Sequence, residues 1–181
     1  MQQDHNRRVG RAGMKMTMAA ALCAGLLVAQ STPPAVPPAT ASPAATLNQL
    51  MRGLFFPNSN VLFLTQRVNP AEIKRSPEPS TSSDPLTGVF NGWDAVETSA
   101  LTLTDAADLL MTPGRKCSNG RDVPVGNADW TVFVNQLRAA GIVAYKAALT
   151  KDQDKMIEAT EVLNSSCANC HNKYRARNRC Q

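Results

Sequence analysis

Residues 167–175, with the sequence CANCHNKYR, decide how this chain is interpreted. Cys167, Cys170 and His171 form the pattern C-x-x-C-H, which is the attachment signal of c-type haem. On a helix, two thiols three positions apart project from one face and can bond the two vinyl groups of a haem. The adjacent imidazole can then ligate the iron. The pattern therefore predicts one covalently attached haem c, with His171 as the proximal iron ligand.

Other uses of a C-x-x-C pattern fit this chain less well. A structural zinc site requires a second pair of ligands, and no other Cys/His pair at ligand spacing occurs in the sequence. A thioredoxin-like dithiol follows a strand within an alternating β/α pattern, which residues 158–166 do not supply. Attachment of haem remains the favoured interpretation.

Apolar residues recur at helical spacing in four segments of the chain. These segments cover residues 47–62, 93–110, 127–148 and 151–174. No stretch alternates convincingly with a period of two, so we expect an all-α fold, an antiparallel four-helix bundle. Thr150 and Gln153 fit a capping box at the start of the fourth helix. Residues 67–90 and 113–126 are expected to be long, irregular connections.

Pro57 interrupts the first of these segments, yet the apolar spacing continues beyond it. Its ring would press on the carbonyl of Gly53, four residues earlier, so we expect a kinked first helix rather than a break. Asn58 and Asn60 lie close to the apolar stripe. We expect them to bond a carbonyl freed at the kink, and the alternative is that they line the haem pocket.

The N-terminal residues have the features of an export signal. Four basic residues precede an apolar run at 16–29, which is shorter than the roughly 20 residues that span a bilayer. An uncharged Pro/Ala-rich linker follows at 31–46, and Ala39-Thr40-Ala41 fits a cleavage site. We therefore divide the chain into residues 1–41, signal and linker, and residues 42–181, a mono-haem domain. The predicted location is periplasmic, with a membrane anchor as the alternative if the signal is retained.

Removal of this signal changes the composition of the chain. The net charge of the whole chain is +5, but four of the 19 Lys and Arg residues and one of the 14 Asp and Glu residues lie in residues 1–41, which leaves +2. No basic stripe interleaved with aromatic residues remains, so a nucleic-acid partner is not expected. His5 also lies in the signal. Because His171 is then the sole histidine and is committed to the iron, we do not expect an enzyme.

A four-helix bundle whose last helix ends in C-x-x-C-H-x-x-Y-R, here Cys167 to Arg175, resembles the cytochrome c-prime superfamily. The resemblance covers roughly residues 44–178 and is strongest in the last helix. It implies that His171 is the proximal ligand and that Arg175 lies beside the proximal pocket. It also implies that a residue of the first helix closes the distal side of the haem, and Met51 best matches that position.

Met51 is the one serious candidate for a sixth iron ligand. Met111 lies at the far end of the second helix, and Met156 lies four turns from His171 on the same helix, so neither easily reaches the distal face. Met51 either ligates the iron or packs as an ordinary core methionine. The chain also departs from the family, which often carries a basic residue where Leu47 stands here.

The further candidate haem contacts are Phe55, on the stripe of the first helix, and Tyr174, within the motif. If Met51 ligates the iron, the protein transfers single electrons between exported redox proteins, which is slightly favoured. If the distal side is crowded and unligated, the protein binds small gases such as NO or CO. The basic residues of 173–179 suit an acidic partner, and they equally suit a helix C-terminus. The resemblance is compatible with a homodimer, which nothing in the sequence demands.

Of the five cysteines, Cys23 lies in the signal and two belong to the motif, which leaves Cys117 and Cys180. In an up-down-up-down bundle, the second and fourth helices finish at the same end, and these two cysteines follow those helices. We therefore expect them to be neighbours. In an oxidising compartment a disulfide between them is favoured over two exposed thiols or a bridge between two chains.

Overall fold

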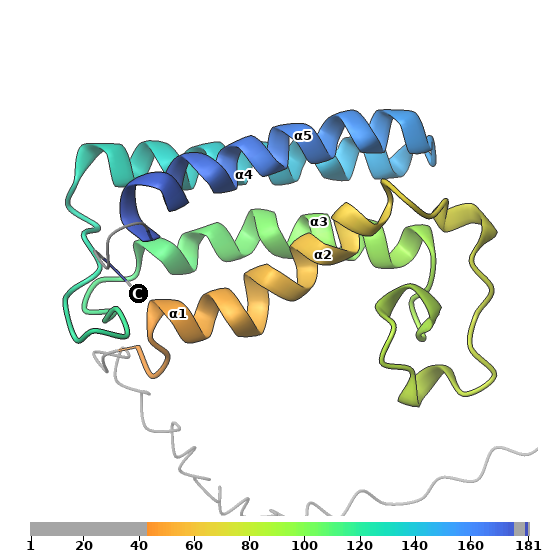
Figure 1. Cartoon of the computed structure of the whole chain (residues 1–181), viewed down its shortest axis with the longest axis horizontal. Helices are drawn as coiled ribbons and strands as arrows, with labels where there is room; N and C mark the ends of the chain where they lie inside the picture. Colours follow the sequence, from red (N-terminus) through yellow and green to blue (C-terminus); the bar gives the residue numbers. More distant parts are fainter. Residues whose placement is uncertain (1–42, 176–179, 181) are drawn as a thin grey trace, which may run out of the picture. The chain divides into compact units, whose positions relative to one another are not determined.

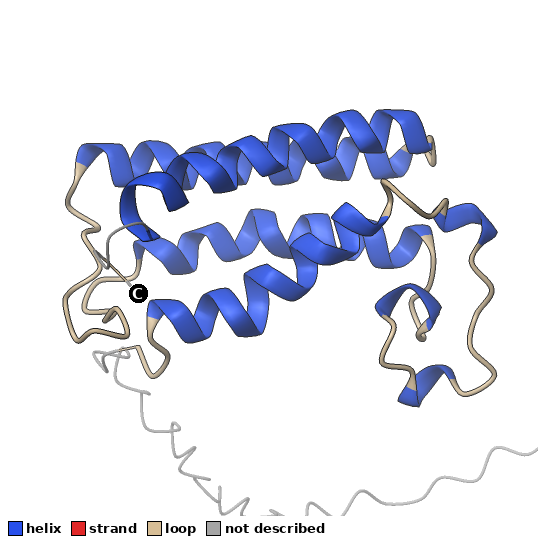
Figure 2. Ribbon diagram, in the orientation of Figure 1, coloured by secondary structure: helices blue, strands red, loops and turns tan. Residues whose placement is uncertain are grey.

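The computed structural model describes residues 43–175 and Cys180; the predicted export signal lies outside the described residues. Within this part, Figure 2 shows helices joined by loops, and no strand. The β pairing found there is one isolated bridge between Lys116 and Asp122. Four helical stretches pack against each other (Figure 1), which confirms an all-α bundle.

The first stretch is one continuous helix made of three parts. It consists of α1 (Leu47–Leu50), a π-helical turn (Met51–Phe55) and α2 (Phe56–Leu64). Thr46 and Gln49 form a capping box at its start: the Gln49 N–H donates to the Thr46 hydroxyl oxygen, and the Gln49 side chain accepts the Thr46 N–H. The chain thus enters this helix at a defined residue.

The helix runs through Pro57 without a break, as the apolar spacing predicts. The backbone N–H of Phe56 donates to the carbonyl of Met51, five residues back, directly ahead of the proline. Proline has no N–H and its ring crowds the carbonyl four residues earlier, here Gly53. A turn widened to the π-helical form accommodates this ring. The expected distortion of the first helix is therefore a π-helical turn.

The other three stretches agree with the predicted segments. They are α3 (Trp93–Ala106), extended by a 3₁₀ turn at Ala107–Met111, then α4 (Ala128–Leu149), and α5 (Gln153–Cys170), extended by a π-helical turn at His171–Arg175. Consecutive stretches run in opposite directions, and α4 packs against both α3 and α5 (Figure 1). The ends of α3 and α5 therefore meet the beginnings of α1 and α4.

The capping box predicted from Thr150 and Gln153 is wrong. Thr150 ends α4, and its hydroxyl donates to the carbonyl of Ala147 at 2.7 Å. The cap of α5 is Asp152, whose carboxylate accepts two backbone N–H groups of the first turn. Lys151, at φ 53°, lies in the left-handed region and reverses the chain between these two residues. Thr150 is thus on the far side of the turn from α5.

The core lies between the four stretches. Its largest fully buried side chains include Trp130, Leu62, Leu86, Leu103, Met156 and Leu163. The long connection at 67–90 contains three short 3₁₀ turns and is otherwise irregular, as expected. Among the described residues, none of the helices combines the length and apolar character needed to cross a bilayer.

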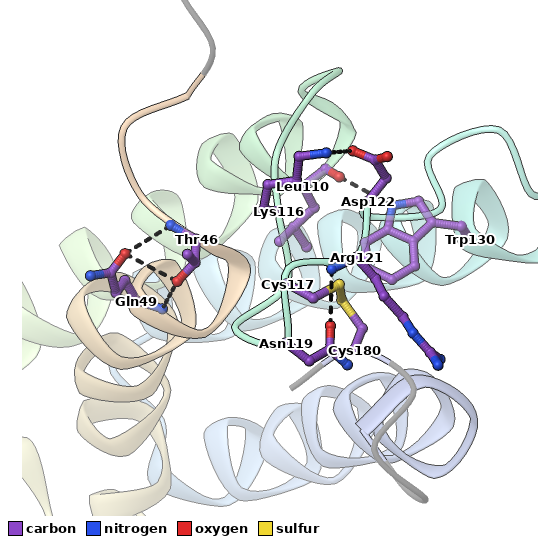
Figure 3. Close-up of a disulfide and its surroundings, with 10 residues drawn as sticks. All are labelled: Thr46, Gln49, Leu110, Lys116, Cys117, Asn119, Arg121, Asp122, Trp130 and Cys180. Atoms are coloured by element: carbon purple, nitrogen blue, oxygen red, sulfur yellow. Dashed lines mark hydrogen bonds and ion pairs between the residues drawn. A yellow bond between two sulfur atoms is a disulfide. The ribbon is translucent and has the colours of Figure 1, made fainter.

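Cys117 and Cys180 form a disulfide, with their Cα atoms 5.0 Å apart (Figure 3). The two residues are 63 positions apart in sequence, and both are buried. The favoured prediction of an intrachain bond is therefore confirmed. Its basis, that α3 and α5 finish at the same end of the bundle, is also what the structure has.

Candidate functional site

A cavity of about 840 Å³ lies at the end of the bundle where α5 finishes. The first helical stretch forms one wall, α4 and the end of α5 form another, and Leu103, Leu110, Ser118 and Cys180 complete it. Pockets that hold small molecules and cofactors typically measure roughly 300–1,000 Å³ and are lined mainly by apolar side chains. This cavity has a suitable size for such a group.

All the predicted site residues line this one cavity. The last helix contributes Cys167, Cys170, His171, Tyr174 and Arg175, and the first contributes Met51 and Phe55. The fold therefore brings together residues that lie more than 110 positions apart in sequence. Met111 and Met156 are not among the lining residues.

The two cysteines of the motif are free, half-buried thiols. Burial raises the pKa of the Cys167 thiol, against an opposing hydrogen bond with Ser166. Burial also raises the pKa of Cys170 to about 11, and the negative charges of Cys167 and Asp129 act in the same direction. Thiols of redox dithiols have a lowered pKa instead. These surroundings, together with the lack of a strand in the described residues, disfavour a thioredoxin-like dithiol.

His171 is half-buried at the point where α5 changes to the π-helical form. Burial lowers the pKa of its imidazole, and the positive charge of Arg175 lowers it further. The neutral imidazole is the form that binds metals. The ring is thus in its ligating state at neutral pH.

Both π-helical turns of the described residues begin at a residue that the sequence predicts to be an iron ligand. One begins at Met51 and the other at His171, on opposite walls of the cavity. Single π-helical turns inside α-helices are rare and occur often at functional sites. The sequence explains only the turn that begins at Met51, which accommodates the ring of Pro57. Nothing in the apolar spacing predicts the turn that begins at His171.

The two asparagines of the first helix behave differently. The Asn58 side-chain amide donates to the carbonyl of Leu54 at 2.7 Å, so the expected bond at the distorted turn is confirmed for this residue. Asn60 lines the cavity, which was the alternative. Beside it, Phe56 lines the cavity while its side chain is 65% exposed, which places these residues at the rim.

A polar network joins the end of α5 to the start of α4. The Tyr174 hydroxyl donates to Asp129 Oδ1 at 2.8 Å and accepts from the Asn127 amide at 3.2 Å, while Lys173 forms an ion pair with Asp129. Hydrogen bonds from Lys173 and Tyr174 lower the pKa of the Asp129 carboxyl. Burial is the main cause of a raised pKa at Tyr174. The phenol is therefore a neutral donor to a charged acceptor.

Aromatic contacts fix the ring of Tyr174 against the cavity wall. Trp130 meets it edge to face with ring centres 4.9 Å apart, and Phe133 does so at 6.1 Å. Trp130 is itself held by its indole N–H, which donates to the carbonyl of Leu110 at 3.1 Å. Trp130 and Phe133 belong to the predicted apolar stripe of their helix. The sequence did not indicate a role for Asp129, because its partner Tyr174 lies 45 positions away.

The charge of the cavity wall is positive. Arg52 and Arg175 line it, and none of the described lining residues is Asp or Glu. Arg52 was missed in the sequence, although it directly follows Met51. Of the basic C-terminal residues, Lys173 is paired with Asp129, and Arg177 and Arg179 lie outside the described residues.

No three or more His, Cys, Asp or Glu side chains among residues 43–175 and 180 are grouped so that they could hold a metal ion. A structural zinc site built from these residues is thus disfavoured. Comparison with family models, with curated proteins and with solved structures finds no match to this chain.

Proposed function

We propose that this protein is an exported mono-haem c-type cytochrome that transfers single electrons. The observation that carries the proposal is the cavity of about 840 Å³, onto which Cys167, Cys170 and His171 face from one wall and Met51 from the other. A covalent haem requires two thiols, a neutral imidazole and an apolar space of this kind in one place. The motif residues provide the two thiols and the imidazole, and the cavity provides the apolar space.

The residues present fit a haem in three respects. Cys167 and Cys170 are free thiols with spacing for two thioether bonds, and the wall is lined by apolar and aromatic side chains. Arg52 and Arg175 offer positive charge without an opposing carboxylate on the described wall, as two haem propionates require. When bound, the haem would supply a one-electron iron couple, and ligation of the iron by Met51 would raise its potential.

This chain's own residues would orient the group and exclude water from it. Phe55 and Tyr174 are buried on the wall and offer flat apolar surface. Asp129 holds the Tyr174 hydroxyl, so that the end of α5 stays against α4. A rigid surround of this type suits electron transfer, since the site does not have to reorganise when the charge of the iron changes.

Gas binding by a five-coordinate iron is the second candidate. It is supported by Phe55 and Phe63, which line the same wall as Met51 and would offer apolar space to a small gas. Electron transfer is preferred because Met51, the predicted sixth ligand, is the one methionine among the described residues that line the cavity. In either case the partner or ligand would be met after export, as the N-terminal sequence predicts.

Optical spectra of the purified haem protein in both oxidation states, with and without CO, test this proposal. For electron transfer with Met51 bound, the reduced spectrum does not change on addition of CO. Met51→Ala should then open the sixth position and bind CO. Met111→Ala is the matched control, because Met111 does not line the cavity, and it should behave as the wild-type protein. Rapid CO binding by the wild-type protein would establish the gas-binding alternative instead.

A further inference from the structure

The loop of residues 115–123 is bonded to both walls of the cavity. Toward the last helix, Cys117 is joined to Cys180 by the disulfide, and the Cys180 N–H donates to the carbonyl of Tyr174 at 3.0 Å. Tyr174 lies three residues after His171. The loop is thus connected, by one covalent and one hydrogen bond, to the turn that carries the proximal ligand.

The same loop holds the start of the first helix. The carbonyl of Lys116 accepts the N–H of Leu47, the first residue of α1, at 2.8 Å. Figure 3 shows the start of α1, with its Thr46 and Gln49 cap, beside this loop and the disulfide. Met51 follows Leu47 by one helical turn. Displacement of Lys116 would therefore displace the wall that carries the candidate distal ligand.

Arg115 adds a second connection to the first helix. Its side chain is buried and donates to the carbonyl of Ala45 at 2.6 Å and to the carbonyl of Leu109 at 3.2 Å. Leu109 belongs to the 3₁₀ turn that ends α3, where a positive charge is favourable. A buried cation bonded to two backbone carbonyls from different elements holds them at a fixed spacing.

Hydrogen bonds within the loop hold it together, so a displacement of one cavity wall would also shift the other wall. The Cys117 N–H donates to the carbonyl of Arg121 at 2.8 Å, and the Val123 N–H donates to the carbonyl of Arg115 at 2.9 Å. An ion pair between Lys116 and Asp122 closes the outer edge at 2.6 Å. Ser118 and Cys180 line the cavity directly.

We propose that the Cys117–Cys180 disulfide and Arg115 are positioning residues that set the spacing between Met51 and His171 across the cavity. This inference rests on the proposed haem function. A disulfide can also stabilise a protein merely by restricting its unfolded chain. The two roles differ in what they predict, because only positioning changes access to the distal side of the haem in the folded protein.

Three variants separate these roles. Cys117→Ser with Cys180→Ser removes the covalent connection, and Arg115→Met removes the second connection while leaving the disulfide intact. Leu86→Ala is the control: Leu86 is a core residue, 2% exposed, in the 3₁₀ turn Pro85–Thr87 ahead of α3, and it does not line the cavity. All three are expected to lower the melting temperature.

The expected result is a specific change at the cavity. Both Cys117→Ser with Cys180→Ser and Arg115→Met, the clamp variants, should keep covalent haem, bind CO where the wild-type protein does not, and exchange the amide hydrogens of residues 47–51 faster than the wild-type protein. Leu86→Ala should melt earlier with CO binding and amide exchange at 47–51 unchanged. If the double serine variant does not accumulate, Arg115→Met carries the test.

The inference is overturned if Leu86→Ala binds CO as readily as the clamp variants do, since loss of stability alone would then be the cause. It is also overturned if the clamp variants keep wild-type CO binding and amide exchange. Failure of the proposed function has a different signature, which is the lack of covalent haem in the wild-type protein itself.

Discussion

At the scale of single residues, Tyr174 and Asp129 join the end of α5 to the start of α4. The phenol donates at 2.8 Å to a carboxylate that Lys173 also pairs, and the ring packs on Trp130. Both hydrogen bonds favour the charged form of Asp129, which is why the pKa of this carboxyl is lowered. The consequence is a contribution to stability that depends on pH.

The pH dependence of this contribution has a defined sign. Because the pKa of Asp129 is lower in the folded protein than the ordinary 3.8, its stabilisation is present above pH 3.8 and is lost as the pH falls through the lowered value. Asp129→Asn should therefore melt at a lower temperature than the wild-type protein at pH 7, and the difference should shrink toward pH 3. Melting curves at several pH values measure it.

Tyr174→Phe is the control for this prediction. It keeps the ring against Trp130 but removes one of the two hydrogen bonds to Asp129, so it should lose part of the effect. A difference in melting temperature between Asp129→Asn and the wild-type protein that stays constant from pH 7 to pH 3 would contradict the assignment.

The residues predicted for the site line one cavity, and most of them could be proposed from the sequence because their pattern is local. Cys167, Cys170 and His171 form a motif, and Met51 was predicted from the position that the family resemblance implies and from elimination of the other methionines. Asp129 and Arg115 could not be found in this way. Each acts through a contact with a residue 45 or 70 positions away, and single-sequence patterns carry no information on such pairs.

At the scale of elements, α3 and α4 approach each other closely at Gly141. A Cβ added there would collide with the Thr104 hydroxyl and would lie 3.2 Å from the carbonyl of Ala100. The Thr104 hydroxyl cannot easily move, because it donates to that same carbonyl at 2.9 Å and is buried. A small residue at this crossing thus sets the separation of the two helices.

Gly141→Ala should lower the free energy of unfolding by about 1–3 kcal/mol, the usual cost of overpacking. Gly53→Ala is a matched control, because a Cβ at Gly53 meets no atom within 4 Å. That change should raise stability by about 0.5–1 kcal/mol, since alanine restricts the unfolded chain and favours helix. Denaturant unfolding of both variants measures these two changes in the free energy of unfolding. Two changes of the same sign would contradict the packing argument.

The helices themselves were predictable, whereas their local irregularities were not. Apolar spacing located all four stretches because each buries one face, and that face repeats every 3.6 residues. The π-helical turns at Met51–Phe55 and His171–Arg175 add one residue to a turn without interrupting this spacing. The sequence also did not identify Asp152 as the cap of α5. Thr150 and Asp152 are both good capping residues two positions apart, and the left-handed backbone at Lys151 determines which of them caps the helix.

At the scale of the whole molecule, the bundle depends on what fills its cavity. A dry void of about 840 Å³ would cost roughly 20 kcal/mol at about 24 cal/mol per Å³. That exceeds the roughly 5–15 kcal/mol by which a whole domain is stable. The space must therefore be filled, either by a bound group or by water entering at the rim beside Phe56 and Asn60.

A covalent haem would make the cofactor part of the hydrophobic core, and this gives the last prediction. Cys167→Ala with Cys170→Ala removes both attachment points, so the bundle should lose its haem, melt at a markedly lower temperature and bind a hydrophobic dye. The double serine variant of Cys117 and Cys180 is the control, because it should keep its haem. Thermal melts followed by circular dichroism, together with haem staining of the denatured protein, distinguish the two. Equal melting temperatures for the alanine variant and the wild-type protein would mean that water fills the cavity in both, because a haem removed from the core cannot leave stability unchanged.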